Sequence, residues 1–344
     1  MKSMKLTGLC QMEMHDIPEP EIADPHEVKI RMKSVGICGS DIHYYKSGRI
    51  GSQVVEFPFT VGHEGAGLVE EVGASVTRVS VGDAVAIDPA MPCFKCSQCL
   101  AGRAHTCENL RFCGCPGQAE GLLSEFVVLP ETSLFPLYGK LGSEQGALSE
   151  PLAIGVYAVR RAGEVAGKTI GITGMGPIGQ AVMAPLRAKG AGDIYAADKI
   201  ADRLRYARNN GAAWTGNPDT ADVVADILAQ QPKGLDIVFE CSGSPEALAQ
   251  TLLLLKPGGK LVLIGIPEEE HITFNFDIMR RKEIDVANIR RQNECVDETL
   301  ELIAASRVQV DNWITHRFPF EQTKAGFDLV ANYADGVLKA MIHF

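Results

Sequence analysis

The stretch that decides the fold is 168-KTIGITGMGPIGQAVMAPLRAKG-190, which 193-DIYAAD-198 follows closely. A short apolar strand pattern leads into the turn Gly174-Met175-Gly176-Pro177-Ile178-Gly179, where a helical pattern begins. A strand, a Gly-x-Gly-x-x-Gly turn and a helix in this order place backbone amides at a helix start, where they can bind a pyrophosphate. The stretch therefore predicts a dinucleotide-binding unit. Pro185, inside that helix, removes a backbone donor and predicts a kink.

An acidic residue at the end of the next strand supports this interpretation. Asp198 lies nineteen positions after Gly179, where a carboxylate can accept hydrogen bonds from ribose hydroxyls and repel a 2′-phosphate. This favours NAD over NADP, although Lys199 and Arg203 lie close by and could pair with a phosphate. The alternative is that the glycines only allow a tight turn and that Asp198 is a surface acid.

The pattern of predicted secondary structure changes near residue 150. Before it, short strand patterns are broken by Gly and Pro, as expected of a small β-barrel-like domain. After it, helical patterns alternate with apolar strands such as LDIVFECSG and KLVLIGI, which predicts an α/β, doubly wound parallel sheet. A helical stretch and a closing strand after about residue 287 are assigned to the first domain. The expected domains are therefore 1–149 with 287–344, and 150–286.

The amino-acid composition limits the classes of partner that we expect for this protein. Lys and Arg total 33 against 43 Asp and Glu, and a net charge of -10 disfavours nucleic acid and acidic membranes as partners. The N-terminal region has no export signal, and no apolar run approaches a membrane span, so we expect a cytoplasmic, soluble protein. The ten cysteines then indicate metal ligation and burial rather than disulfides.

Four of these cysteines form a compact cluster. Cys93, Cys96, Cys99 and Cys107 follow the spacing C-x2-C-x2-C-x7-C, which lets one loop wrap four thiolates around a tetrahedral ion. With no fifth donor such a site is closed and structural. Structural zinc is the interpretation; the alternatives are an iron-sulfur cluster, a nucleic-acid-binding zinc ribbon or four ordinary thiols.

A second set of potential ligands lies in Cys38-Gly-Ser-Asp-Ile-His and Gly62-His63-Glu64-Gly. Cys38, His63 and Glu64 offer sulfur, nitrogen and oxygen donors, which suit a zinc ion that leaves one position open for chemistry. Taken singly, each residue is more often an ordinary buried cysteine, a satisfied histidine or a surface acid. Their occurrence together with the cysteine loop and the dinucleotide motif favours a catalytic metal.

Taken together, the motifs resemble the sorbitol dehydrogenase group of zinc-containing medium-chain dehydrogenases over nearly the whole chain. The motifs that carry the resemblance are CGSDIHYYKSGRIG, VGHEGAG, the four-cysteine loop, SEPLAIG, GMGPIG and THRFPFE. The resemblance implies a GroES-like barrel domain completed by C-terminal segments, a Rossmann domain, and an active site in the cleft between them.

The resemblance also implies roles around the catalytic zinc. Its ligands would be Cys38, His63 and Glu64, with Glu150 approaching it directly or through water. Alcohol dehydrogenases of the simple type tend to have cysteine at the position of Glu150, which points to a polyol enzyme. Three further residues would support this chemistry: Asp41 orients the zinc-binding histidine, and Ser40 and His43 carry the alcohol proton outward.

Further roles concern the substrate and the cofactor. Tyr44, Phe112 and Arg290 match positions that line a polyol pocket, although the first two could equally be packing residues and Arg290 surface charge. Arg291 adjoins Arg290, so the register there could slip by one. The expected cofactor contacts outside the glycine turn are Asp198, Lys199, Arg203, Cys241, Ile266 and Lys339, the last near the pyrophosphate.

These expectations describe a zinc-dependent oxidoreductase that transfers hydride between a polyol and NAD and yields a ketone or ketose. Two zinc ions per chain and a homo-oligomer, a tetramer or a dimer, are expected. The alternatives are another zinc dehydrogenase, acting on L-threonine or a polyol phosphate, or a non-catalytic zinc-binding interaction protein. The identity of the polyol, its stereochemistry and the direction of flux stay open.

Overall fold

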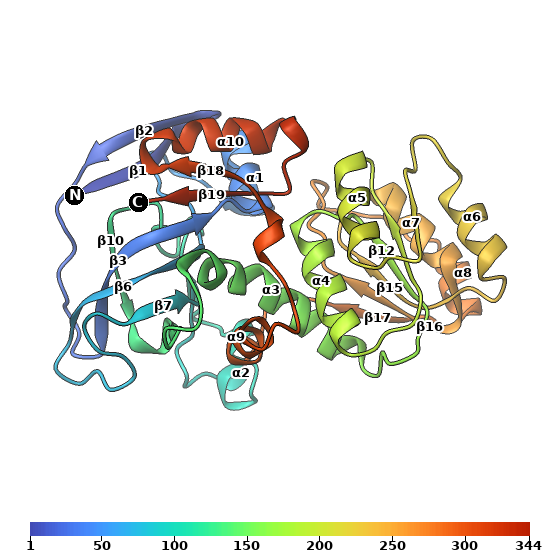
Figure 1. The fold of residues 1–344 in the computed structure, drawn as a ribbon, viewed down its shortest axis with the longest axis horizontal. Helices are drawn as coiled ribbons and strands as arrows, with labels where there is room; N and C mark the ends of the chain where they lie inside the picture. The colour runs from blue at the N-terminus through green and yellow to red at the C-terminus, as the bar shows by residue number, and fades with distance from the viewer. The chain divides into compact units, whose positions relative to one another are not determined.

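The computed structural model describes residues 1–344 and divides them into two compact units (Figure 1). The first unit comprises Met1–Glu150 and Val296–Phe344, and the second comprises Pro151–Cys295. The domain boundary predicted at residue 287 lies too early in the chain, because the second unit continues to Cys295. Residue 287 lies inside β17 (Asp285–Asn288), and β17 pairs with the sheet of the second unit.

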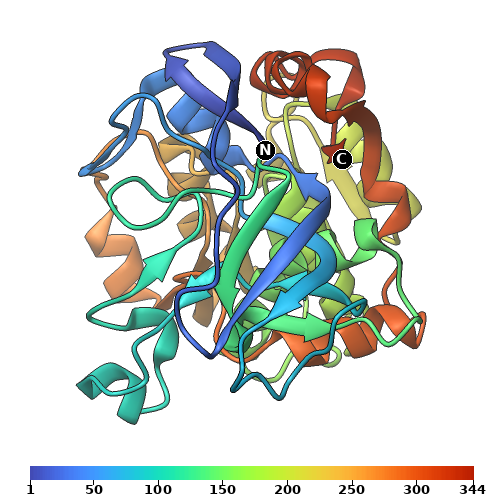
Figure 2. The same ribbon diagram turned by 90° about the vertical axis from the view of Figure 1, so that its left-hand side faces the viewer.

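A seven-stranded sheet forms the centre of the first unit, in the order β11-β7-β6-β3-β19-β18, with β10 also paired to β3. Val28, Ile30 and Met32 alternate along β3 and are buried, which is the period-2 pattern of a half-buried strand. The C-terminal strand β19 pairs with β3, so the end of the chain completes a sheet begun at its start. Figure 2 shows β10, in green, beside β3, in blue. The bounds of these strands are β3 Glu27–Gly36, β6 Glu64–Val72, β7 Ala84–Ile87, β10 Phe126–Pro130, β11 Leu134–Pro136, β18 Ile314–Pro319 and β19 Lys339–His343.

Smaller elements surround this sheet. The short strands are β1 Lys2–Gly8, β2 Gln11–Asp16, β4 Arg49–Ile50, β5 Gln53–Val54, β8 Ala90–Met91 and β9 Arg111–Phe112. The helices are α1 Gly39–Ser47, α2 Ser97–Leu100, α9 Val296–Ala304 and α10 Thr323–Ala331, with α3 Ser143–Ala162 beginning in this unit and ending in the second.

The second unit is built on a six-stranded sheet in the order β14-β13-β12-β15-β16-β17, with every neighbouring pair parallel. This confirms the predicted doubly wound sheet. Because the strand order reverses beside β12, the carboxyl ends of β12 and β15 flank the switch point at which such sheets bind ligands. The elements are β12 Ile170–Thr173, α4 Pro177–Ala188, β13 Ile194–Ala197, α5 Ala201–Asn209, β14 Trp214–Gly216, α6 Val223–Gln230, β15 Leu235–Glu240, α7 Pro245–Leu254, β16 Leu255–Leu263 and α8 Phe276–Arg281.

Pro185 lies inside α4, and the helix continues past it to Ala188. A proline at this position cannot donate to the carbonyl of Ala181 one turn earlier. That carbonyl is covered by α3 instead, because a Cβ built on Gly155 would stand only 1.9 Å from Ala181 O. The absence of a side chain at Gly155 therefore lets the two helices meet at the carbonyl that the proline leaves without its usual donor.

None of the helices combines the length and the apolar character that crossing a membrane would require.

Candidate zinc and dinucleotide sites

Cys38, His63 and Glu64 gather in the first unit, with one ligand atom from each lying within 4.8 Å of the others. Cys38 is the N-cap of α1, while His63 and Glu64 stand at the start of β6. The sheet brings these segments together because Gly36, at the end of β3, pairs with Glu64. A thiolate, an imidazole and a carboxylate at this spacing are a donor set that fits zinc.

Asp41 joins the two ligand-bearing segments. Its fully buried carboxylate accepts hydrogen bonds from the backbone N–H of Cys38 at 3.0 Å and of Gly62 at 3.2 Å. His63 Nδ1 lies 3.3 Å from Asp41 Oδ1. A carboxylate at this distance holds the ring in one orientation and favours a proton on Nδ1, which leaves Nε2 for a metal. This geometry supports the orienting role expected of Asp41.

Glu64 has a partner that the sequence did not suggest. Lys339 Nζ donates to both carboxylate oxygens of Glu64, at 2.7 and 2.6 Å, and to the carbonyl of Ile37 at 3.1 Å. Burial lowers the pKa of Lys339, but the negative charges of Glu64, Cys38 and Glu150 and the hydrogen bonds to Glu64 together outweigh it and raise that pKa. Lys339 is only 1% exposed, so its ammonium group is enclosed beside Glu64. The cofactor contact expected of Lys339 stays a prediction.

Glu150 is the last residue of α3 that belongs to the first unit, and it is 6% exposed. Its Oε2 is buried and has no hydrogen-bond partner. Burial, together with the nearby charges of Glu64 and Asp88, raises the pKa of Glu150 to about 7, against the lowering effect of His63 and Lys339. A buried carboxylate oxygen without a donor is costly unless a cation or a water completes it. Glu150 thus fits a position beside a metal ion.

Two of the remaining residues expected around this cluster, Ser40 and Phe112, border it. Ser40 Oγ donates to Cys38 Sγ at 3.3 Å, and the Phe112 ring lies 5.6 Å from the His63 ring, so both border the cluster. Tyr44 is buried, and its hydroxyl donates to Gln53 Oε1 at 3.3 Å.

His43 is half-buried on α1. Arg290 is exposed and belongs to the second unit, so it is not among the residues that the first unit gathers around Cys38. Gln53, which also donates to Cys115 Sγ at 2.9 Å, carries no sequence signal beyond its place in a short hairpin.

The four-cysteine loop closes as its spacing predicts. The sulfur atoms of Cys93 and Cys107 lie 3.4 Å apart, those of Cys96 and Cys99 3.6 Å, and those of Cys96 and Cys107 3.8 Å. Four thiolates around a tetrahedral zinc, with Zn–S near 2.3 Å, require sulfur separations of about 3.8 Å. The loop therefore already has nearly the dimensions of a zinc site.

Acidity within the loop differs among the thiols. A hydrogen bond from the backbone of Lys95 lowers the pKa of Cys93 to about 6, whereas burial and the neighbouring thiols raise the pKa of Cys99 to about 12. Four thiolates so close together repel one another, and a divalent cation relieves that repulsion. The donor set thus fits a bound metal.

The glycine turn of the second unit follows β12 and has no room for a side chain at Gly174 or Gly179. Gly174 has φ +85°, and a Cβ there would stand 2.7 Å from Ser242 N; a Cβ on Gly179 would stand 2.1 Å from Gly174 O. α4 begins immediately after Gly176, with Pro177 in its first turn. The helix start and the narrow turn form the cradle that a pyrophosphate requires.

Asp198 lies beside this turn and is buried rather than a solvated surface acid. It accepts the backbone N–H of Met175 at 2.6 Å and of Ile200 at 2.8 Å. The Arg203 guanidinium reaches the same place, 3.9 Å from Asp198 Oδ2 and close to the position of a Cβ on Gly176. Lys199 points elsewhere, since its ammonium pairs with the exposed Asp219 at 3.2 Å.

Cys241 and Ile266 follow β15 and β16, so they stand at the same carboxyl edge of the sheet as the glycine turn. Cys241 is half-buried and Ile266 is 47% exposed. The structure therefore collects the glycine turn, Asp198, Arg203, Cys241 and Ile266 along one edge of one sheet.

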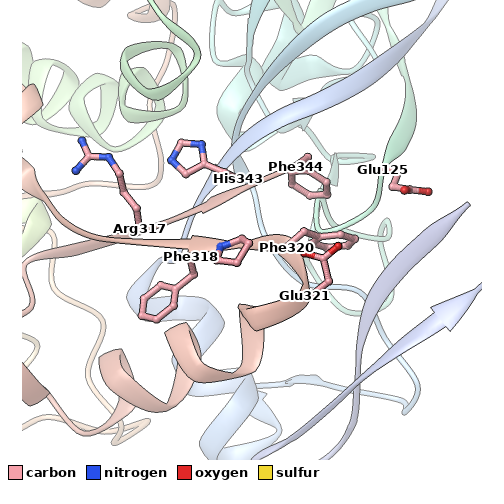
Figure 3. A pocket seen from close by; sticks show the side chains of 8 residues that line it. Glu125, Arg317, Phe318, Phe320, Glu321, His343 and Phe344 are labelled. Atoms are coloured by element: carbon pink, nitrogen blue, oxygen red, sulfur yellow. The ribbon is translucent and has the colours of Figure 1, made fainter.

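An open pocket with a volume of about 460 Å³ lies elsewhere in the first unit (Figure 3). Its basic residues already have an acidic neighbour: Arg317 donates to both carboxylate oxygens of Glu144, and His343 Nε2 lies 3.0 Å from Glu144 Oε1. The Phe320 and Phe344 rings, which both line the pocket, stack with centroids 4.2 Å apart (Figure 3). None of the residues expected in the metal or dinucleotide sites lines it.

Comparisons with known proteins identify the family of the chain. Residues 24–139 match the alcohol dehydrogenase GroES-like domain, and residues 177–305 match the zinc-binding dehydrogenase family. The chain is 34% identical to sorbitol dehydrogenase of Bacillus subtilis over 100% of its own length and 97% of the relative's. It is 36% identical to L-idonate 5-dehydrogenase of Vitis vinifera, covering 92% of this chain and 87% of that protein.

A solved structure described as a zinc-binding dehydrogenase from Sinorhizobium meliloti 1021, bound to NADP, superposes with a TM-score of 0.91. It is 29% identical, and the match covers 100% of this chain and 99% of the other. The expected resemblance is confirmed: the chain belongs to the zinc-binding dehydrogenase family and is an oxidoreductase built from a GroES-like domain and a nucleotide-binding Rossmann fold.

Proposed function

We propose that this chain oxidises a secondary hydroxyl of a polyol to a ketone, using NAD and a catalytic zinc, with a second zinc in the four-cysteine loop. The observation that carries the proposal is the buried, unpartnered carboxylate oxygen of Glu150 in a unit that also gathers Cys38, His63 and Glu64. A carboxylate adds negative charge and hydrogen-bonding capacity to the site. Such a site favours a substrate with several hydroxyl groups over a plain alkyl alcohol.

The residues of the first unit have distinct tasks in this reaction. Zinc, when bound by Cys38, His63 and Glu64, supplies a Lewis acid that lowers the pKa of the substrate hydroxyl, and NAD accepts the hydride. Asp41 keeps the His63 ring in its ligating orientation. Ser40, which borders Cys38, takes up the hydroxyl proton, and His43 on the same helix carries it outward.

NAD is proposed as the cofactor because the buried carboxylate of Asp198 stands beside the glycine turn, where it would repel a 2′-phosphate. The relative solved with NADP shows that the family fold also accepts the phosphorylated cofactor. Arg203, close to Asp198, offers the positive charge through which such acceptance could arise. From the resemblance to the sorbitol dehydrogenase group, we also propose a homo-oligomer, a tetramer or a dimer, which sedimentation analysis would test.

The substrate proposal is tested with a panel of alcohols at fixed NAD. Sorbitol, xylitol, 2,3-butanediol and L-idonate should have kcat/KM values at least about a hundredfold above that of ethanol, because unmade hydrogen bonds at a polar site cost about 1 to 3 kcal/mol each. If ethanol or L-threonine outperforms every polyol, the polyol proposal fails while the dehydrogenase assignment stands.

Arg290 provides a second test of the same proposal. Arg290→Ala should lower kcat/KM for polyols by about tenfold or more and change that for 2-propanol much less, because only polyols carry further hydroxyls, besides the one that is oxidised, for the guanidinium to bind. Arg281→Ala, an exposed arginine of α8 that pairs with Asp277, is the matched control and should leave both values unchanged. Equal losses for polyols and 2-propanol would remove Arg290 from the substrate site.

A further inference from the structure

Glu240 is a buried carboxylic acid at the switch point of the second unit. It is the last residue of β15, and it pairs in register with Thr173, the last residue of β12. The strand order of the sheet reverses between these two strands. Glu240 is only 3% exposed, and burial raises its pKa against the lowering effect of its hydrogen bonds. No part of the proposed chemistry uses it.

The hydrogen bonds of Glu240 hold two loops at once. Its Oε1 accepts from Ser242 N at 2.7 Å, from Ser242 Oγ at 2.5 Å and from Gly243 N at 3.0 Å. Its backbone carbonyl accepts from Ile264 N at 2.9 Å and from Gly265 N at 3.0 Å. The side chain thus fixes the loop after β15, and the main chain fixes the loop after β16.

These loops also pack against each other and against the glycine turn so closely that no space remains for an added Cβ atom. A Cβ on Gly174 would stand 2.7 Å from Ser242 N, and one on Gly243 would stand 2.4 Å from Ile266 O. A Cβ on Gly265 would stand 2.5 Å from Glu240 Oε2. Displacing the Glu240 carboxylate must therefore displace the loops that carry Cys241 to Gly243 and Gly265 to Ile266.

A dinucleotide lies across such a switch point with one mononucleotide on each side. Asp198, which ends the β13 side, marks the side of the adenosine ribose. The other mononucleotide, which carries the nicotinamide, then lies over the carboxyl ends of β15 and β16, where the two loops held by Glu240 stand.

We propose that Glu240 is a positioning residue for the nicotinamide half of the cofactor. It acts by setting the loops after β15 and β16 through the contacts given above. The inference rests on the proposed NAD site and adds a residue that determines how tightly one half of the cofactor is held.

The test compares Glu240→Gln with a matched control on the same strand. Asp236, at the opposite end of β15, likewise accepts a backbone N–H and a hydroxyl, both from Thr169 at 2.8 Å. Asp236→Asn therefore disturbs an equivalent carboxylate away from the carboxyl edge. The Kd of NADH is measured by fluorescence titration and the Kd of AMP, which contains only the adenosine half, by calorimetry.

We expect Glu240→Gln to raise the Kd of NADH about tenfold and to leave the Kd of AMP within about twofold, because its amide oxygen is a weaker acceptor than a carboxylate and its amide nitrogen cannot accept the Gly243 N–H, which also reaches Oε2. At saturating NAD, kcat should change little. Asp236→Asn should lower the Tm without changing either Kd. An unchanged Kd of NADH in a folded Glu240→Gln, or an equal loss of AMP and NADH binding, would overturn the inference.

Ser242→Ala is the second variant, needed if Glu240→Gln does not fold. It removes only the hydroxyl that donates to Glu240, so the Kd of NADH should rise roughly threefold with AMP unaffected. No change in the Kd of NADH for this variant would also overturn the inference. Failure of the unaltered protein to bind NADH would refute the NAD proposal instead, so the two failures are distinguishable.

Discussion

Asp198 uses both carboxylate oxygens to hold the backbone around the cofactor turn, and it also places a negative charge there. Asp198→Ala should therefore shift the ratio of kcat/KM for NAD to that for NADP by about tenfold or more towards NADP, since repulsion of the 2′-phosphate is lost. Asp202→Ala, which removes a half-buried acid of α5 that pairs with Arg205, serves as the control. An unchanged ratio for Asp198→Ala would show that this carboxylate does not select the cofactor.

Glu131 is a residue whose contribution to stability depends on pH. Its carboxylate accepts the backbone N–H groups of Thr77 and Arg78 and lies 3.1 Å from His26 Nδ1, and the hydrogen bond from Thr77 is the largest cause that lowers its pKa from 4.5 to about 2. Because folding lowers the pKa of Glu131, its ionised carboxylate stabilises the fold at pH values above the pKa of the unfolded chain. This stabilisation is lost as the pH falls from about 4.5 towards 2.

Glu131→Gln should consequently lower the free energy of unfolding by about 1 to 2 kcal/mol near neutral pH, as expected for charged hydrogen bonds. The difference from the unaltered protein should shrink as the pH is lowered below about 4.5. Urea unfolding at several pH values measures it, with the exposed Glu71→Gln as control. A difference that stays constant across this range would contradict the assigned role.

At the scale of elements, the contact between α3 and α4 depends on one missing side chain. Gly155→Ala would place a Cβ 1.9 Å from the carbonyl oxygen of Ala181, and backbone atoms cannot yield as a flexible side chain does. We expect a loss of about 1 to 3 kcal/mol in stability, typical of overpacking, despite the better helix propensity of alanine. Gly142→Ala, with nothing within 4 Å of its Cβ, should change stability little in the same thermal unfolding experiment.

At the scale of the whole molecule, the two proposed zinc sites should differ in lability. Four thiolates would close one site, whereas Cys38, His63 and Glu64 would leave a position open at the other, so its metal should exchange more readily. Mild chelation should remove one zinc together with activity, and metal analysis should find the second zinc still bound. Fully active protein with a single zinc per chain would contradict the proposal of two sites.

The sequence by itself determined the features that depend on local spacing. One loop holds the four cysteines, and one strand, turn and helix hold the glycines, so their geometry follows from a short stretch of chain. The doubly wound sheet could be predicted because alternating strands and helices leave few topologies. Cys38 lies too far along the chain from His63 and Glu64 for spacing alone to join them. Their donor types favoured a shared metal site only beside the other motifs, and the resemblance to a known family supported it.

Only the tertiary structure decided which groups distant in the sequence form an ion pair or a hydrogen bond. Lys339 was expected near a pyrophosphate, and the sequence did not suggest that β19, paired beside β3, places its ammonium against Glu64, 275 positions away in the sequence. Glu240 showed no signal, because its importance comes from the loops that the parallel sheet brings around it. The physical reason is the same in both cases: the cost of burying a charge is met by partners that only the folded chain brings within reach.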